Sequence, residues 1–386
     1  METTDVLFTL FVTLIIYTYL IYPLIIYIWG RFVKQKETIK KIEKYPSVTL
    51  LIPGHNIHHL VKTKVENIMK QEYEGHLKFL FVLDGCTDST EELLTELKNK
   101  NNPFLLDIVS TKERNGKEAA IRVALEKVDT KVIVFSDSDA MLNPDCVQKL
   151  IEKLMQEGVG AVSGREIHRK SSEQGASEGQ GLFYKYEEFI KKYLNNVGSL
   201  PYVQGGNFAM FKELYPEDIP LGCTQDGVIA FNVVSKGYRV SYEPKAISSE
   251  EYNLSNKEDF SRRVRTITRA FYSIICKPQV FNPLKTGSYF LHVLSGRIFR
   301  WFALFFALFT LFFGLCSESE NIYYFTLGGF ITWISLALVG YLTERKGKRI
   351  KLPYFVYYFS YIHLAAAIAV VKVCLGKRTS VWKPSN

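Results

Sequence analysis

Cysteine is scarce in this sequence, with six residues among 386, and no two of them form a CxxC pair. This spacing argues against a disulfide framework or a zinc site and suits a reducing compartment. Charge is absent from the first apolar run, residues 7–29, which is long enough to cross a bilayer. The run also lacks a basic segment before it and a cleavage site of small residues after it, so a signal peptide is disfavoured. We therefore expect a transmembrane helix over residues 1–30.

Charge elsewhere is plentiful and unevenly placed. The formal net charge is +9, and the basic residues lie beside the apolar runs. No motif of a nucleic-acid-binding module occurs, so the basic balance favours an anionic membrane surface and not nucleic acid as the partner. Lysine and arginine are frequent in residues 31–44, directly after the first apolar run. The positive-inside rule then places the segment that follows in the cytosol.

Three further apolar runs occupy residues 301–316, 322–343 and 353–375. We expect residues 281–386 to form an interfacial segment followed by about three transmembrane helices. Basic residues at 344–351 are a second cytosolic signal. Four spans would leave the last residues outside the cell, whereas Lys377, Arg378 and Lys383 favour the inside, so the orientation of the last run stays open. A transporter would need more spans and more polar residues within them.

The middle of the sequence, residues 31–280, alternates short apolar runs with helical patterns. The runs read as strands at 47–52, 77–83, 105–109 and 132–135. Apolar strands that alternate with helices predict a mostly parallel sheet covered on both faces. The expected fold class is therefore α/β, with a Rossmann-like cytosolic domain flanked by transmembrane helices. In such sheets, ligands bind at the carboxyl ends of the strands.

Polar clusters follow three of these strands, at Pro53–Asn56, Asp84–Asp88 and Asp137–Asp139. Asp137 and Asp139 are two residues apart, so in an extended segment both carboxylates can point the same way. They would repel each other unless a cation lay between them. Mg²⁺ or Mn²⁺ takes one or two protein carboxylates and fills its shell with phosphate oxygens and water, so the pair predicts a metal-bound diphosphate. A basic turn that enters a helix, Arg114–Lys117, could attract phosphate or could simply be solvated.

Seven motifs, taken in order, resemble those of the membrane-integral family 2 glycosyltransferases of the GT-A type. They are LLIPGHN (50–56), VLDGCTDST (82–90), RNGKEAAIRVAL (114–125), VFSDSDAMLNPD (134–145), QGGNFAMFK (204–212), TQDGVIAFNVVSKGYRVSYEPKA (224–246) and DFSRRVRTITRAF (259–271). Trp382, after the last apolar run, also resembles the terminal pattern of this family. The resemblance covers nearly the whole chain, and it implies a GT-A domain.

The resemblance implies a role for each matching residue. The nucleotide would be bound by Pro53, His55, Asn56, Asp84, Lys117 and Asp137. Asp139 would coordinate the Mg²⁺ or Mn²⁺ ion, and Asp226 would be the catalytic base. The acceptor side would be lined by Gln204, Gly205 and Gly206. A basic interfacial helix near residues 257–276 would hold the leaving diphosphate through Arg262, Arg263, Arg265 and Arg269.

These roles imply an inverting transferase with a nucleotide-sugar donor, expected to be a UDP-sugar, and a lipid-linked or saccharide acceptor at the cytosolic face of a membrane. Sugar transfer passes through an oxocarbenium-like state, and the metal and the arginines would stabilise the departing diphosphate. The chain departs from the family pattern at Ile57, where an acid is common, and at Ala270, where processive synthases carry tryptophan. We therefore favour limited sugar transfer. A processive polysaccharide synthase and a catalytically inactive membrane scaffold are the alternatives.

Overall fold

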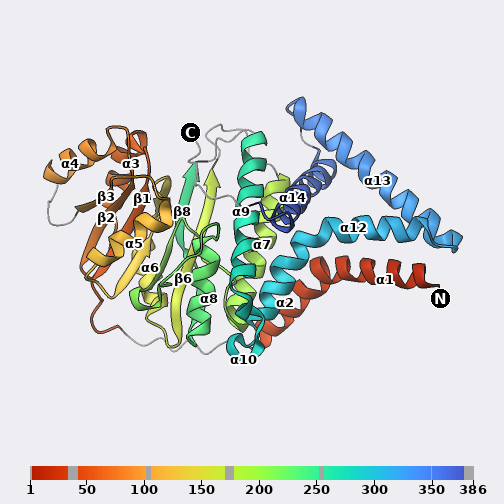
Figure 1. Cartoon of the computed structure of the whole chain (residues 1–386), viewed down its shortest axis with the longest axis horizontal. Coiled ribbons are helices and arrows are strands. Elements are labelled where there is room, and N and C mark those ends of the chain that lie inside the picture. The colour runs from red at the N-terminus through yellow and green to blue at the C-terminus, as the bar shows by residue number, and fades with distance from the viewer. Residues whose placement is uncertain are drawn as a thin grey trace.

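The computed structural model describes residues 2–33, 42–100, 106–169, 178–251, 256–348 and 350–377. An α/β domain lies at one end of the molecule and a group of long apolar helices at the other (Figure 1). The terminal tryptophan of the family pattern, Trp382, lies outside the described residues.

A single sheet of eight strands forms the centre of the domain, in the order β3-β2-β1-β4-β7-β6-β8-β5. The strands are β1 (Val48–Gly54), β2 (Leu77–Asp84), β3 (Leu106–Thr111), β4 (Val132–Phe135), β5 (Ala140–Leu142), β6 (Val159–Arg169), β7 (Phe208–Phe211) and β8 (Arg239–Glu251). Strands β3, β2, β1 and β4 run parallel, as the sequence predicts. In the other half, β7 is antiparallel to β4 and β6, β6 is parallel to β8, and β5 is antiparallel to β8. The α/β class is confirmed, and the sheet is mixed.

Helices cover both faces of this sheet because alternate strand residues face opposite sides. In β1, Leu50 and Ile52 pack into one core and Leu51 into the other, and all three are fully buried. The first core holds α3 (His58–Ile68), α4 (Thr90–Lys100) and α6 (Cys146–Leu154), and the second holds α5 (Lys117–Lys127) and α8 (Gln225–Ser235). The apolar strands of this part of the sheet are therefore buried on both faces.

A lysine occupies the core face of α3. Lys64 lies between the buried Val61, Val65 and Ile68 and is itself fully buried. Its Nζ donates hydrogen bonds of 2.8 Å to Ser136 Oγ and 2.9 Å to the carbonyl of residue 137, and it also donates to the carbonyl of residue 140. Burial lowers the pKa of Lys64 to about 8, although the nearby carboxylates of residues 139 and 137 act to raise it. Lys64 thus fixes the loop between β4 and β5 from inside the core.

Two helices connect the domain to the apolar end of the molecule. These are α7 (Glu178–Val197) and the amphipathic α9 (Asn256–Cys276), and α9 spans the predicted basic segment. Both stand between the sheet and the long apolar helices in Figure 1. A short turn of α10 (Pro283–Thr286) follows α9 and leads into the first long apolar helix of this half.

Four helical stretches are long and apolar enough to cross a membrane: Thr3–Phe32, Tyr289–Leu315, Glu320–Arg345 and Lys351–Cys374. The first comprises α1 (Thr3–Ile16) and α2 (Tyr22–Phe32), and the second comprises α11 (Tyr289–Val293) and α12 (Phe299–Leu315). Each of these two contains a π-helical segment, at Tyr17–Ile21 and at Leu294–Ile298. The other two are α13 (Glu320–Arg345) and α14 (Lys351–Cys374). One stretch before the domain and three after it match the expectation from the sequence.

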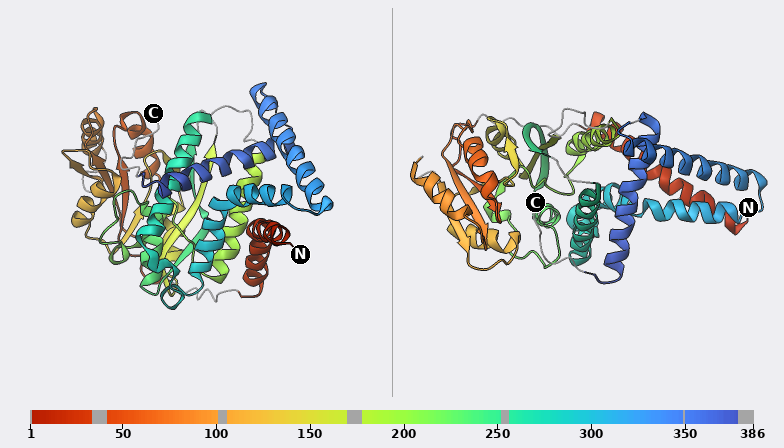
Figure 2. Two further views of the ribbon diagram at one scale, coloured as in Figure 1. Left: turned by 45° about the vertical axis from the view of Figure 1, so that its right-hand side comes forward. Right: turned by 90° about the horizontal axis from the view of Figure 1, so that it is seen from above.

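The last of these helices differs from the other three in direction and burial. Seen from above, α14 lies across the direction that α1, α12 and α13 share (Figure 2). Half of its most apolar window, 50%, is buried in the protein, against 11–22% for the others. It packs against α9, α12, α13 and α7. This placement favours a helix that lies along the protein near the membrane surface, with three spans in place of four.

We predict that the chain just after α14 lies on the same side of the membrane as the α/β domain. Three spans return the chain to that side, and Lys372 and Lys377 agree with it. Epitope tags placed after Lys377 and, in a separate variant, after Glu318 between α12 and α13 test this in sealed, oriented vesicles. The tag at 377 should share the antibody accessibility of the α/β domain, and the tag at 318 should show the opposite. A tag at 377 that follows the tag at 318 would show that α14 crosses the bilayer.

We also predict that Lys64→Met lowers the melting temperature. The change removes three hydrogen bonds of the Lys64 ammonium group, and a buried acceptor left unsatisfied costs about 1–3 kcal/mol. Lys62→Met is the matched control, because Lys62 is exposed on the same helix. Thermal unfolding of the purified chain measures both variants. Equal melting temperatures for the two would mean that Lys64 does not support the loop after β4.

Candidate active site

The loops that follow β1, β2 and β4 meet at one edge of the sheet, where α9 faces them. A cavity of about 100 Å³ lies there. Its wall includes Pro53, Gly54, Asp84, Lys117, Asp137, Asp139, Arg262 and Arg265. The structure therefore gathers residues predicted to bind nucleotide, metal and diphosphate around one small space.

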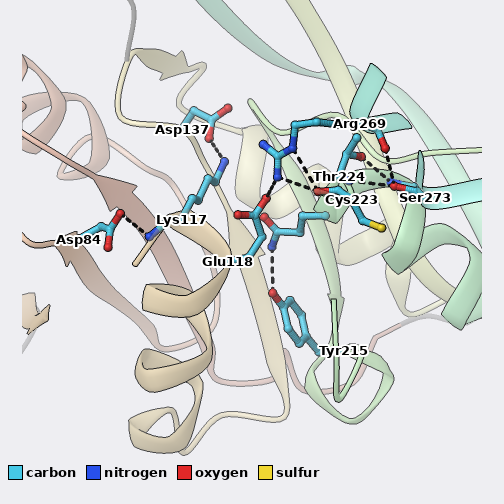
Figure 3. A network of polar contacts seen from close by, with 12 residues as sticks. Asp84, Lys117, Glu118, Asp137, Tyr215, Cys223, Thr224, Arg269 and Ser273 are labelled. Atoms are coloured by element: carbon cyan, nitrogen blue, oxygen red, sulfur yellow. Dashed lines mark hydrogen bonds and ion pairs between the residues drawn. The ribbon is translucent and has the colours of Figure 1, made fainter. Parts of the chain in front are cut away.

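Asp84, at the end of β2, organises the loop that begins α5. The side chain is buried, and its two carboxylate oxygens accept hydrogen bonds from the backbone N–H groups of Asn115 and Gly116, both at 2.9 Å (Figure 3). Gly116 has a φ of +96°, a conformation that L side chains rarely adopt. Asp84 thereby fixes the turn from which Lys117 projects. Its predicted contact with the nucleotide stays a prediction.

Lys117 forms an ion pair with Asp137 (Figure 3). Burial alone would lower the pKa of Lys117, but the carboxylates of Asp137 and Asp226 outweigh it, and the pKa is raised. The loop at Gly205 approaches this pair closely, since a Cβ at residue 205 would lie 2.9 Å from Asp137 Oδ2. Lys117 therefore holds a positive charge between two of the predicted site carboxylates.

Asp139 follows β4 and keeps a raised pKa in spite of a nearby arginine. Burial, with Glu250 and Asp137 nearby, raises its pKa to about 6, while Arg262 acts to lower it. Arg262 is engaged by Glu250, to which it donates a hydrogen bond of 3.1 Å. The described residues contain no cluster of three His, Cys, Asp or Glu side chains that could hold a metal ion on its own. Asp139 fits an ion that takes one protein carboxylate and completes its shell with phosphate oxygens and water.

Asp226 lies in the first turn of α8, and its carboxylate is not used to cap that helix. Thr224 is the cap, with Oγ1 accepting a hydrogen bond of 3.2 Å from the N–H of Gly227. Burial raises the pKa of Asp226 to about 6, and Lys117 acts against this rise. Asp226 lines a second, larger cavity of about 490 Å³ together with Lys117 and Asp137. A carboxylate of this pKa in a cavity is suited to accept a proton near neutral pH.

The four predicted arginines of α9 all line this larger cavity, but they make different contacts. Arg269 donates to the carbonyl of Cys223 at 2.7 Å and pairs with Glu118 (Figure 3). Arg263 pairs with Asp259 at 2.8 Å and donates to the hydroxyl of Tyr358 on α14 at 3.0 Å.

Arg265 differs from Arg262 and Arg263 in the direction of its pKa shift. Burial, with Arg262 and Arg269 on either side along the helix, lowers its pKa. An anion bound there would relieve that repulsion. Arg262 and Arg265, which also line the small cavity, are therefore the best placed of the four for a diphosphate, and the roles of all four stay predictions.

His55 and Asn56 connect the loop after β1 to the loop after β2, and neither lines the small cavity. The Nδ1 of His55 donates to the carbonyl of Asp84 at 2.7 Å, and the imidazole is buried. Asn56 adopts a φ of +52° and exchanges hydrogen bonds with Thr87, at 2.9 Å to its backbone N–H and 3.0 Å to its hydroxyl. Their predicted roles in nucleotide binding remain predictions.

The segment predicted for the acceptor side, residues 204–206, lines the larger cavity. Gln204 accepts a hydrogen bond from Lys191 at 3.0 Å and donates one to Glu166 at 3.3 Å. A Cβ at Gly206 would lie 2.7 Å from Glu166 Oε1, so a side chain there would displace this carboxylate.

Sequence reasoning missed several polar residues of the site: Lys64, Glu118, Glu166, Lys191 and Glu250. Lys64 could have been found, because it occupies a core position in the apolar pattern of α3. Glu118 pairs with Arg269, 151 residues away, and nothing in its local sequence indicates that partner. Glu166, Lys191 and Glu250 have partners 12 to 38 residues away in other segments, and Lys191 also pairs with Glu188 on its own helix.

Comparison with known proteins relates the sequence and the fold to glycosyltransferases. Residues 49–217 match the model of glycosyl transferase family 2. The poly-beta-1,6-N-acetyl-D-glucosamine synthase of Staphylococcus aureus (strain COL) is 24% identical over 226 residues, which cover 56% of this chain and 53% of that protein. The O-antigen chain rhamnosyltransferase RfbN of Salmonella typhimurium is 26% identical over 225 residues, which cover 56% of this chain and 69% of that protein. The chain thus spans about half the length of the first of these relatives.

Among solved structures, the mannosyltransferase PcManGT from Pyrobaculum calidifontis, in complex with GDP-Man and Mn²⁺, superimposes with a TM-score of 0.72. The match covers 96% of this chain and 100% of that chain at 20% identity, so it establishes a shared fold. The family match, the named relatives and the fold agree: residues 49–217 carry a family 2 glycosyltransferase domain, the chain has a GT-A fold, and it also has helices that are able to enter a membrane.

Proposed function

We propose that this protein is an inverting glycosyltransferase that moves a sugar from a nucleotide sugar, expected to be a UDP-sugar, to an acceptor held at the membrane. One observation carries the proposal. Asp226, with its raised pKa, lines the same cavity as Lys117, Asp137 and the arginines that also border the small diphosphate cavity. A proton acceptor and an anion site thus face one space, as transfer with inversion requires.

In the proposed reaction, a hydroxyl oxygen of the acceptor attacks the anomeric carbon of the donor sugar. A new carbon–oxygen bond forms as the bond from that carbon to the terminal phosphate oxygen breaks. The electron pair of the broken bond leaves on the nucleoside diphosphate, and the hydroxyl proton passes to Asp226. Attack from the face opposite the leaving group inverts the anomeric configuration.

Negative charge develops on the diphosphate during this step. Lys117, Arg262 and Arg265 line the small cavity and would stabilise that charge in a partly desolvated setting. Asp139 would hold the Mg²⁺ or Mn²⁺ ion, which supplies Lewis-acid stabilisation of the phosphate oxygens when bound. The basic residues beside the first apolar run support a cytosolic position for the domain.

A processive polysaccharide synthase is the second candidate. The larger cavity carries aromatic side chains from outside α9, namely Tyr184, Tyr202 and Trp301. Such faces can stack on a growing saccharide even though Ala270 replaces the tryptophan of the processive pattern. The inactive scaffold is disfavoured, because Asp139, Asp226 and the arginines are all present and converge on the two cavities.

We predict that Asp226→Asn lowers kcat by at least about a hundredfold and leaves UDP binding unchanged, because only the proton acceptor is lost. Asp218→Asn, on the exposed surface, is the matched control and should keep full activity. Product formation from a panel of nucleotide sugars, followed by mass spectrometry, measures both. Unchanged turnover in Asp226→Asn would remove this residue as the base.

The raised pKa of Asp226 also predicts a pH dependence. Ionised Asp226 is required, so kcat/KM should fall below about pH 6, the pKa of this carboxyl. A folded-state pKa above the unfolded one favours the fold at low pH, and this contribution is lost as pH rises through about 6. Asp226→Asn should therefore melt higher than the parent at pH 8 and close to it at pH 4. If the variant melted at a lower temperature than the parent at pH 8, ionised Asp226 would not destabilise the fold as predicted.

We predict that Asp139→Ala weakens metal-dependent UDP binding by at least about tenfold, since the ion loses its protein carboxylate. Titration of UDP with and without Mn²⁺ measures the metal-dependent part. Asp129→Ala is the control, because Asp129 is exposed and remote from both cavities. A parent protein that binds UDP equally well with and without metal would defeat the claim.

A further inference from the structure

The first turn of α5 carries two charged side chains that reach different parts of the site. Lys117 pairs with Asp137, and Glu118 pairs with Arg269 on α9 (Figure 3). Adjacent residues of a helix lie about 100° apart around its axis, so their side chains do not face the same partner. The function proposed above gives roles to Lys117 and Asp226 and leaves the pair of Glu118 and Arg269 without one.

The ion pair of Glu118 and Arg269 is largely shielded from water. The Glu118 side chain is 23% exposed and that of Arg269 is 17% exposed, and both residues line the larger cavity. An ion pair in such a setting is stronger than one on the surface, and removal of one partner leaves the other charge poorly compensated. The carboxylate of Glu118 therefore restrains where the guanidinium of Arg269 lies.

Arg269 is one of two side chains of α9 that hold the loop before Asp226. Its Nε and one terminal nitrogen donate hydrogen bonds of 3.2 Å and 2.7 Å to the carbonyl of Cys223. One turn further along α9, Ser273 Oγ accepts a hydrogen bond of 2.8 Å from the N–H of Thr224. Asp226 follows two residues later, in the first turn of α8. Two side chains of α9 thus hold successive backbone groups just before the proposed base.

The carboxylate of Asp226 is also within electrostatic reach of this ion pair. Arg269 acts to lower the pKa of Asp226, whereas Glu118 acts to raise it. Among the residues that the structure describes, Arg269 forms an ion pair with Glu118 and with no other acid. Without Glu118, the guanidinium would be able to turn towards Asp226, whose negative charge attracts it.

We propose that Glu118 is a positioning residue of the transfer reaction, which holds Arg269 on the carbonyl of Cys223 and away from the carboxylate of Asp226. An arginine paired with Asp226 would make this carboxylate a weaker proton acceptor and would obstruct the acceptor hydroxyl. Glu118 prevents that pairing and keeps Arg269 in contact with the loop. The inference rests on the proposed function, because it concerns the base of that reaction.

The charged groups around Asp226 determine how its pKa responds to a variant. Those that act on it come from α5, from the loop after β4 and from α9, and they are Lys117, Glu118, Asp137 and Arg269. The nearby Tyr215 stays neutral, because burial raises the pKa of its hydroxyl. Loss of the Glu118 charge and pairing of Arg269 with Asp226 would both lower the pKa of Asp226, so the two effects have the same sign.

We predict that Glu118→Gln moves the acid limb of the kcat/KM profile from about pH 6 to about pH 5 or lower. It should also lower kcat at pH 8 by about tenfold or more, because Arg269 then engages Asp226. UDP binding with Mn²⁺ should be unchanged, since Glu118 does not line the small cavity. Glu118→Asp retains the charge and should stay closer to the parent. Glu126→Gln, exposed on the same helix, is the matched control.

A second set of variants separates positioning from a general loss of structure. Arg269→Gln removes a charge that lowers the pKa of Asp226, so its acid limb should lie above that of the parent. The double variant Glu118→Gln/Arg269→Gln should have its limb near that of the parent, because neither charge remains. If Glu118→Gln lowered kcat without moving the limb, Glu118 would be a structural residue only and the proposal would be wrong.

Hydrogen exchange of the ligand-free full chain tests the contact without any sugar donor. The backbone amides of residues 224–228 should exchange at least about fivefold faster in Glu118→Gln and in Arg269→Gln than in the parent and in Glu126→Gln. Equal exchange in all four proteins would overturn the inference. A parent that shows these differences but neither binds UDP with Mn²⁺ nor hydrolyses any donor would refute the transferase and leave Glu118 as the residue that positions Arg269.

Discussion

The burial of acidic side chains at one edge of the sheet is the constraint on which the site depends. Burial is the main reason that the pKa values of Asp139 and Asp226 both rise to about 6, and the nearby Asp137 adds to the rise of each. Two lysines, Lys64 and Lys117, support the segments that carry these carboxylates. Lys64 holds the backbone of the β4–β5 loop from the core, and Lys117 pairs with Asp137 from the start of α5. Asp139 and Asp226 keep raised pKa values in spite of nearby cations, and they are the residues proposed to hold the metal ion and to accept the proton.

Contacts of two arginines on α9 connect the sheet to the apolar helices. Arg269 on α9 pairs with Glu118 on α5 and donates to the carbonyl of Cys223, three residues before Asp226. One arginine therefore joins α9, α5 and the loop before Asp226. From the same helix, Arg263 donates a hydrogen bond to Tyr358 on α14. These contacts link α14, α9 and the loop before Asp226 in one continuous series.

The local sequence pattern predicted the parallel half of the sheet and the loops that contain the candidate site residues. The apolar strands, the polar residues at their ends and the basic segment of α9 are all visible in short windows of sequence. The mixed half could not be predicted in this way, because β7 lies between β4 and β6, and β8 runs beside β6 and β5, through pairings distant in sequence. The same limit applies to side chains: Lys64 departs visibly from the apolar pattern of α3, whereas Glu118 gains its role only from Arg269, far along the chain.

The aromatic side chain missing at position 270 shows how a local motif can mislead. Its absence from α9 favours limited transfer when the sequence is read alone. The cavity nevertheless has aromatic faces, since Trp301 reaches it from α12 and Tyr202 from the loop before Gln204. Tyr202 is also occupied by the guanidinium of Arg297, so its face is engaged by a cation and is less open to stack on a sugar. The motif of α9 therefore reports only the side chains of that helix, whereas the wall of the cavity is assembled from several elements.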